Sequence, residues 1–327
     1  MAFLKRLGSI LFWRYHRLRA SWPVWYYILN REPRRRWRSF GLSLDERGNA
    51  IVRALQDDGI AALPLTDFLP EALLADLVRE AAQRAERLAG GAFKTEQNDA
   101  RVELKSGIFS ANTKKYQKDF LVNIWGEGNP PAGRAGLPLL DPENPFLRLA
   151  LGERVLGIVG AYLELAPRFH YFSLLSTVIL PPDAPAQYSQ RWHRDSEDRK
   201  MVKVFLYLTD VEAAGAGPFT YVKGSQRGGR FGRLFPQHPP VGSYPPPGAV
   251  ERAVPADAIR TCYGKAGTLI FCDTTGLHRG GYSTTRERIM FTASYVSKAS
   301  LHPAGYKMPS GTSFSSLSPL ARSALGL

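Results

Sequence analysis

The sequence is poor in cysteine and in uninterrupted apolar stretches. Its two cysteines, Cys262 and Cys272, provide neither a disulfide framework nor the spacing of a zinc site. Both lie in or beside strand-like runs, which predicts buried thiols and fits a reducing cytoplasm. The longest uncharged run near the N-terminus, residues 20–30, is shorter than the ~20 apolar residues of a transmembrane helix, and Pro23 interrupts it. No spanning helix is therefore predicted there.

Acidic residues are scarce in the first 40 positions. The whole chain carries 43 Lys and Arg residues against 29 Asp and Glu residues, a formal net charge of +14. Residues 1–40 contain ten of the basic residues and the single acid Glu32, so they account for +9 of the excess. The ten are Lys5, Arg6, Arg14, Arg17, Arg19, Arg31, Arg34, Arg35, Arg36 and Arg38. The positive charge is therefore mainly a property of the N-terminal segment, residues 1–41.

The N-terminal segment is also aromatic and amphipathic. Four of the six tryptophans lie in it, and its first apolar side chains, Phe3, Leu4, Leu7, Ile10 and Leu11, fall on roughly one 120° arc of a helix. This combination predicts a helix in the membrane interface, with aromatic rings at headgroup depth and basic side chains against anionic lipid. The alternative is an N-terminal extension that packs on the folded domain with solvated arginines. Nucleic-acid binding is disfavoured because no nucleic-acid-binding module accompanies the basic residues.

A secretory signal is not expected at this end of the chain. Arg14, Arg17 and Arg19 follow the short apolar run, and no small-residue cleavage site appears. The expected location is the cytoplasm, peripheral on the inner face of the cytoplasmic membrane.

The rest of the chain reads as helices followed by strands. Helices are predicted over residues 42–56, 71–88 and 146–165, and a Gly- and Pro-rich loop over 126–145. Strands are predicted over 171–180, 192–195, 202–209, 219–222, 268–272 and 289–296. We therefore expect an α+β, mainly β fold over residues 42–300, a double-stranded β-helix (jelly-roll, cupin-like) barrel buttressed by helices. Residues 301–327 read as a C-terminal tail, and its Ser-rich part after Gly311 reads as a loosely held terminus.

Histidine and carboxylate residues with the spacing of a metal site lie in the strand-rich half. Alternate side chains of a strand share a face, so His193 and Asp195 can point to one place while Arg194 points away. His278 would come from a strand that is remote in sequence but adjacent in space. Two imidazoles and one carboxylate on one side of a metal are the ligand set of non-haem Fe(II) oxygenases. With six histidines in the chain, a single His-x-Asp also arises by chance, so the argument needs the later residues.

Arg288 stands at the start of an apolar, strand-like run, ten residues after His278. A guanidinium there could hold a carboxylate through two parallel charge-assisted hydrogen bonds. This suits the distal carboxylate of 2-oxoglutarate, whose other end would chelate iron. Taken alone, Arg288 would be interpreted as a solvated salt bridge at a strand end.

Several motifs, in this order, resemble the phytanoyl-CoA dioxygenase (PhyH-like) family of Fe(II)/2-oxoglutarate oxygenases. The likeness covers about residues 44 to 298. The matching pieces are residues 55–60 leading into 68–70, Gln190-Arg191-Trp192-His193-Arg194-Asp195, 204–210, Gly217-Pro218-Phe219, Gly224-Ser225-Gln226, 267–271, His278-Arg279-Gly280 and Arg288. The chain departs from the family at Gln226, where Gly-Ser-His is common.

The resemblance implies an enzyme that uses Fe(II), 2-oxoglutarate and O2. It implies that His193, Asp195 and His278 hold the metal and that Arg288 binds 2-oxoglutarate. Related halogenases replace the carboxylate ligand with a small residue, so Asp195 favours hydroxylation. Desaturation and epimerisation stay open, because the same ligands support them. A non-catalytic jelly-roll that binds a ligand and keeps the metal for structure is the alternative from another class.

An irregular insertion over residues 227–259 interrupts the strands. Long segments of this kind often bind ligands, so Arg227, Arg230 and Arg233 are candidates for holding an anionic substrate; the alternative is a solvated loop. Together with the basic N-terminal segment they favour a small-molecule or lipid-linked anionic substrate at a membrane surface, such as the lipopolysaccharide sugar Kdo or a lipid. The family resemblance also permits an acyl-CoA or a small natural-product intermediate. The sequence does not specify an oligomeric state.

Overall fold

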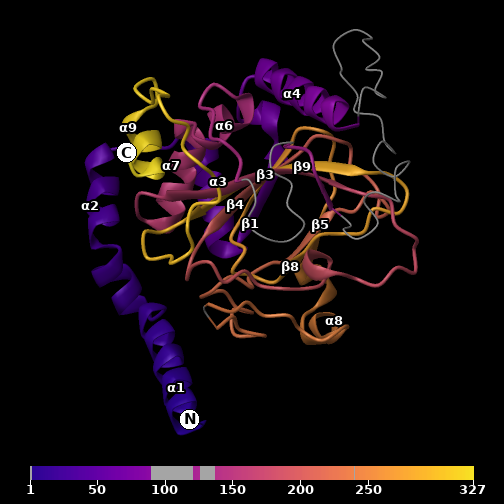
Figure 1. The fold of residues 1–327 in the computed structure, drawn as a ribbon. Helices are drawn as coiled ribbons and strands as arrows, with labels where there is room; N and C mark the ends of the chain where they lie inside the picture. Colours follow the sequence, from indigo (N-terminus) through magenta and orange to yellow (C-terminus); the bar gives the residue numbers. More distant parts are fainter. Residues whose placement is uncertain (1, 90–120, 126–136, 239) are drawn as a thin grey trace.

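The computed structural model describes residues 2–89, 121–125, 137–238 and 240–327, with side chains from residue 8 onward. A six-stranded antiparallel sheet in the order β1-β7-β4-β9-β3-β2 forms its centre, and a three-stranded sheet in the order β6-β5-β8 lies beside it (Figure 1). The strands of the large sheet are β1 (Ile60–Pro64), β2 (Leu121–Asn123), β3 (Arg168–Thr177), β4 (Val202–Tyr207), β7 (Thr268–Cys272) and β9 (Arg288–Val296). Those of the small sheet are β5 (Phe219–Val222), β6 (Ile259–Cys262) and β8 (His278–Arg279).

Helices cover one face of the large sheet. They are α3 (Glu46–Asp57), α4 (Glu71–Ala89), α6 (Pro145–Ala150), α7 (Glu153–Leu163) and α9 (Pro319–Leu325). Side chains along β4 alternate between the two faces of the sheet. Val202, Val204 and Leu206 lie on the face that the helices cover and belong to the core there. Local signals define the helix starts: the Asp45 carboxylate accepts from Gly48 N at α3, and the Asn144 side chain accepts from Phe146 N at α6.

The opposite face of the large sheet packs against the small sheet. Phe205 and Tyr207 of β4 share a buried cluster with Phe219 and Tyr221 of β5. Both cysteines belong to this cluster, so the prediction of buried thiols is confirmed. The large antiparallel sheet and the helices on it are also as expected; the closed barrel stays a prediction.

The interior is filled unevenly along the large sheet. On the side of β1, β7 and β4 the inward-facing residues are buried and mostly apolar. On β3 the alternate residues Tyr171, Ser173 and Leu175 face the interior yet are only partly buried, whereas Phe172 and Leu174 on the helix side are fully buried. The β3 and β9 half of the interior is therefore the more open one.

Most predicted elements that the structure describes match the observed ones, with two differences. The predicted helix over 146–165 is divided at Leu151 and Gly152 into α6 and α7. Residues 192–195 form isolated bridges rather than a regular strand. Most of the predicted 126–145 loop lies outside the described residues.

The prediction of a loosely held C-terminal tail was wrong. Helix α9 closes the chain, with Ser318 accepting a hydrogen bond from Ala321 N at its start. Leu320, Ala321 and Ala324 lie in the helix-side core. The tail is ordered because these apolar residues, three and four positions apart, make one face of a helix that packs on the domain.

The N-terminal segment consists of α1 (Ala2–Arg19), the π-helical turn η1 (Val24–Leu29) and α2 (Arg31–Phe40). Figure 1 shows α1 pointing away from the body of the molecule, with η1 and α2 running back toward α9. Within η1 the Trp25 side chain is buried in the core. Within the part of the chain that the structure describes, no helix has the length and apolar character of a membrane span.

Candidate metal centre

His193 and His278 are placed opposite each other by backbone pairing. His193 N donates to His278 O at 2.9 Å, and His278 N donates to His193 O at 3.0 Å. Two residues further on, Asp195 N donates to Thr274 O at 3.0 Å. The segment that carries Thr274 and His278 and the segment after Gln190 are thus held in register, and the two imidazole rings lie 4.1 Å apart between centroids.

The three predicted ligands converge on one point. One ligand atom from each of His193, Asp195 and His278 lies within 4.8 Å of the other two. His193 Nε2 is 3.8 Å from Asp195 Oδ1, and His278 Nε2 is 3.6 Å from Asp195 Oδ2. These separations leave room for a metal at ligand distances of about 2.0–2.2 Å. Two neutral nitrogens and one carboxylate suit Fe(II), so the donor set fits the metal that the sequence predicts.

Backbone carbonyls orient both imidazoles. His193 Nδ1 lies 2.8 Å from Arg191 O, and His278 Nδ1 lies 3.0 Å from Gly276 O. Because a carbonyl only accepts, Nδ1 carries the proton in each ring and the Nε2 lone pair faces the gap. Burial lowers the pKa of His193, and burial followed by the neighbouring His193 lowers the pKa of His278 to about 3. Both rings are therefore neutral, as metal ligands must be.

Lys203 is a further member of the site that the sequence analysis missed. Its Nζ lies 2.6 Å from Asp195 Oδ2 and 3.5 Å from Glu197 Oε1. Burial acts to raise the pKa of Asp195, but Lys203 and the two imidazoles outweigh it, so the pKa is lowered and the carboxylate stays ionised. The available signal was a charged residue inside the otherwise apolar run 202–207.

Arg288 is buried on the inward-facing side of β9, with only 4% of its surface exposed. One guanidinium nitrogen donates to Gly217 O, while Nε has no hydrogen-bond partner. Among the residues that the structure describes, no acidic side chain forms an ion pair with it. A Cβ placed on Gly280, two residues after His278, would be 3.6 Å from Arg288 Nη2. A buried guanidinium with spare donors beside the metal ligands fits a carboxylate of 2-oxoglutarate.

Arg194 points away from the metal ligands, as the alternation predicts. Its guanidinium donates to four backbone carbonyls, those of Ser225, Phe231, Leu234 and Thr275. Two of these belong to the insertion, so Arg194 fastens the insertion to the segment that carries two metal ligands.

The three arginines proposed for substrate lie elsewhere. Arg227, Arg230 and Arg233 are exposed, and Arg230 rests on the Phe231 ring at 4.4 Å. Among the described residues none of the three makes a hydrogen bond or ion pair with the triad, and their role stays a prediction.

A recess adjoins the triad on another side. It has a volume of about 450 Å³ and is lined by Ala186, Gln187, Tyr188, Arg191 and Tyr244. The Tyr244 ring stacks on His193, with centroids 5.6 Å apart and an angle of 13° between planes. The Arg191 guanidinium lies 5.4 Å from the same ring. The recess therefore offers an aromatic wall and a cation directly beside a metal ligand.

Comparisons with known proteins return solved structures only. No family model and no curated protein matches the chain. The structure is similar to the epimerase SnoN in complex with Fe3+, alpha ketoglutarate and nogalamycin RO (15% identity, 82% of this chain and 92% of that chain, TM-score 0.47). It is also similar to EctD from S. alaskensis with 2-oxoglutarate and 5-hydroxyectoine (16% identity, 78% and 76%, TM-score 0.44). HygX from Streptomyces hygroscopicus with nickel and 2-oxoglutarate matches at 14% identity (77% and 87%, TM-score 0.44). At this level of similarity, a functional assignment depends on the residues of the metal centre itself.

Proposed function

We propose that this protein is a non-haem Fe(II)/2-oxoglutarate-dependent dioxygenase with a PhyH-like jelly-roll domain. One observation carries the proposal: His193, Asp195 and His278 converge, and the buried, incompletely paired guanidinium of Arg288 lies next to Gly280, two residues after His278. A metal triad alone would also suit a structural site. A spare carboxylate-binding cation next to it has a use only when a carboxylate co-substrate binds there.

Each residue has a defined task in this proposal. His193 and His278 would hold Fe(II) through Nε2, and Asp195 through a carboxylate oxygen. Arg288 would hold the distal carboxylate of 2-oxoglutarate. When bound, iron and 2-oxoglutarate supply the oxidation of a C–H bond by O2, with succinate and CO2 as co-products.

The chain's own side chains also shield the reacting centre. The Phe219 ring lies 5.7 Å from the His278 ring, and the Phe205 ring lies 4.8 Å from Phe219. These apolar groups limit water on one side of the metal. Lys203 holds one oxygen of Asp195, which leaves the other for the metal.

For the substrate we propose an anionic molecule presented at a membrane surface, such as the lipopolysaccharide sugar Kdo or a lipid, with the protein peripheral on the inner face of the cytoplasmic membrane. The cationic Arg191 at the recess and the basic N-terminal segment support this choice. Arg230 and Arg233 are kept as further candidates. Unchanged stimulation by anionic lipid extract in an Arg230→Ala/Arg233→Ala variant would remove them.

Succinate formation tests the proposed reaction. The protein, loaded anaerobically with Fe(II), is given 2-oxoglutarate and O2, with and without lipid extract, and compared with the variants His193→Ala and Arg288→Ala. Slow turnover in the parent protein should be lost in both variants and kept in Arg286→Ala, which changes an exposed arginine two positions from Arg288. Metal retention without turnover and without iron-dependent 2-oxoglutarate binding would instead support a non-catalytic binding protein.

A further inference from the structure

Helix α1 leaves an apolar stripe uncovered. Leu11, Tyr15 and Leu18, spaced at i, i+4 and i+7, lie on one side of the helix and are 57%, 51% and 61% exposed. The exposed Arg14 and Arg17 flank the stripe. Single exposed apolar residues are ordinary, but a continuous exposed stripe marks a surface that contacts something else.

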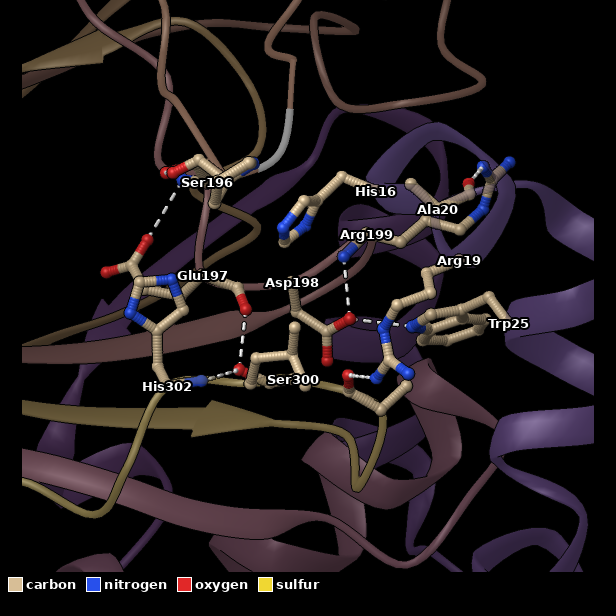
Figure 2. A pocket seen from close by; sticks show the side chains of 13 residues that line it. His16, Arg19, Ala20, Trp25, Ser196, Glu197, Asp198, Arg199, Ser300 and His302 are labelled. Atoms are coloured by element: carbon tan, nitrogen blue, oxygen red, sulfur yellow. Dashed lines mark hydrogen bonds between the residues drawn. The ribbon is translucent and has the colours of Figure 1, made fainter. Parts of the chain in front are cut away.

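The side of α1 that faces the domain is the polar one. His16, Arg19 and Ala20 line a small pocket of about 50 Å³ against residues 196–199 and 299–302 (Figure 2). Arg19 donates to Ala299 O at 2.8 Å. A helix at a protein surface normally buries its apolar side and exposes its polar side. In α1 the apolar stripe is exposed while Arg19 binds the domain, so packing among the residues that the structure describes does not account for the stripe.

Exposed apolar side chains continue beyond the helix. Trp22, Tyr27 and Ile28 are exposed, although their neighbour Trp25 is buried. We call Leu11, Tyr15, Leu18, Trp22, Tyr27 and Ile28 the N-terminal apolar face.

The positive charge around the N-terminal apolar face indicates which kind of partner binds it. Arg14, Arg17, Arg31 and Arg35 are exposed along the same segment. Glu32, the only acid within residues 1–40, is already engaged by Arg36 at 2.7 Å. Leu, Tyr and Trp with arginine are the composition that inserts shallowly at headgroup depth and attracts anionic lipid. A second copy would bring the same positive charge to a symmetric contact, which opposes pairing.

We propose that the N-terminal apolar face binds the surface of an anionic phospholipid bilayer. The binding itself is independent of the oxygenase activity, whereas delivery of substrate from the bilayer rests on the proposed function. The face inserts by its leucine, tyrosine and tryptophan side chains, and the arginines contact the lipid phosphates.

The N-terminal segment is hydrogen-bonded to the segment that carries Asp195. Trp25 Nε1 donates to Asp198 Oδ1 at 2.6 Å, and Asp198 is three residues after Asp195 (Figure 2). Asp198 Oδ2 also accepts from Ser297 N at 2.6 Å, directly after β9. Three residues span at most about 11 Å. A bilayer bound to the N-terminal apolar face is therefore held in a fixed relation to the metal centre.

A second connection runs through the insertion. Pro240 lines the pocket beneath α1, and Tyr244, four residues later, stacks on His193 in the recess. The same short segment thus reaches from the docking helix to the recess, so the recess opens close to where the bilayer lies.

Vesicle binding by the full-length chain tests the proposal. Truncation is unsuitable because Trp25, Asn30 and Pro33 are buried, so point changes at exposed positions are used. The parent protein should float with vesicles of phosphatidylglycerol and phosphatidylcholine and bind vesicles of phosphatidylcholine alone at least about tenfold more weakly. Leu11→Glu/Leu18→Glu should lower binding to the anionic vesicles by about 100-fold, and Arg14→Ala/Arg17→Ala by about tenfold.

Controls separate docking from folding and catalysis. Both double variants should keep the parent's thermal unfolding midpoint and its uncoupled 2-oxoglutarate turnover, and Arg286→Ala, at an exposed position, should bind vesicles like the parent. Equal flotation of the parent and Leu11→Glu/Leu18→Glu, or no flotation of the parent, would overturn the proposal. A dimer by light scattering that this variant converts to a monomer, without vesicle binding, would assign the face to a second copy. Because vesicle binding needs neither iron nor 2-oxoglutarate, its failure is distinct from failure of the proposed reaction.

Discussion

Two buried arginines lie near the metal ligands, and their surroundings differ in one respect. Around Arg194, at the junction with the insertion, four backbone carbonyls accept from the guanidinium. Around Arg288, on the inner side of β9, one carbonyl accepts and Nε is unpartnered. Burying a charge without full pairing costs free energy. The Nε of Arg194 is unpartnered as well, but four carbonyls pair the rest of that guanidinium, whereas Arg288 keeps most of its donors for a ligand.

Replacing Arg194 should give the largest effect on folding. Arg194→Ala leaves the carbonyls of Ser225, Leu234 and Thr275 without this donor, while Phe231 O keeps Leu234 N, so we expect the free energy of unfolding to fall by about 3–5 kcal/mol. Urea unfolding of the apo protein measures this. Arg230→Ala is the control, since an exposed arginine should change stability by less than about 0.5 kcal/mol. A stable Arg194→Ala protein would mean that the insertion is held by other contacts.

Replacing Arg288 should separate binding from stability. Arg288→Ala removes an underpaired buried charge, so the free energy of unfolding should change by less than about 1 kcal/mol. Affinity for 2-oxoglutarate, titrated calorimetrically into the Mn(II)-loaded protein, should fall about 100-fold. Arg288→Lys, which keeps the charge but loses the planar fork, should fall about tenfold. If Arg288→Ala were strongly destabilised but still bound 2-oxoglutarate, Arg288 would be a structural residue like Arg194 and not a ligand-binding one.

The buried ammonium of Lys203 can be compared with the guanidinium groups of Arg194 and Arg288. Lys203 is paired with Asp195, a residue that the metal also needs. Lys203→Met removes the repulsion between the ammonium and the metal, so Mn(II) should bind about tenfold more tightly at neutral pH. Mn(II) titration by electron paramagnetic resonance measures it, with Lys298→Met at an exposed site as control. Weaker binding in Lys203→Met would show that the lysine organises the carboxylate more than it opposes the metal.

Protonation of the imidazoles should give the smallest effect on the free energy of unfolding, and this effect should appear only at acidic pH. Unfolded histidine titrates near 6.5, whereas the pKa of His278 is lowered to about 3 by burial and His193. Between these values the unfolded state binds the extra proton, so stability of the apo protein falls as pH decreases below about 6.5, by about 1 kcal/mol in the first pH unit. His278→Gln should flatten this dependence in urea unfolding measured from pH 7.5 to 5.5. An unchanged slope would place the acid sensitivity at another group.

The sequence predicted the metal centre better than its surroundings. Alternation along 193–195 placed His193 and Asp195 on one side and Arg194 on the other, because strand geometry is local. Lys203 was missed because its partner is defined by packing between segments rather than by spacing. The contact of Trp25 with Asp198 joins positions 173 residues apart and likewise leaves no local pattern.

The N-terminal and C-terminal ends show the same limit. The predicted N-terminal helix is observed, while the side chains of Phe3, Leu4 and Leu7 in its predicted apolar arc lie outside the described residues, and which side meets the domain depends on tertiary contacts. The last helix was taken for a tail because its Ser-rich approach hid three apolar residues at helical spacing. The spacing of apolar residues identifies the apolar side of a helix, whereas the surface that this side packs against is decided by the tertiary fold.

The hydrogen bond from His193 to the backbone of residue 191 bears on how the proposed enzyme could diversify. The carbonyl of Arg191 aligns the imidazole, while the side chain of the same residue lines the recess. Main-chain oxygens survive every substitution, so mutation at this position can alter what the recess accepts without disturbing the alignment of the iron ligand. A substitution at residue 191 can therefore change substrate selectivity without weakening metal binding, which makes this residue a suitable first position for directed evolution toward new substrates.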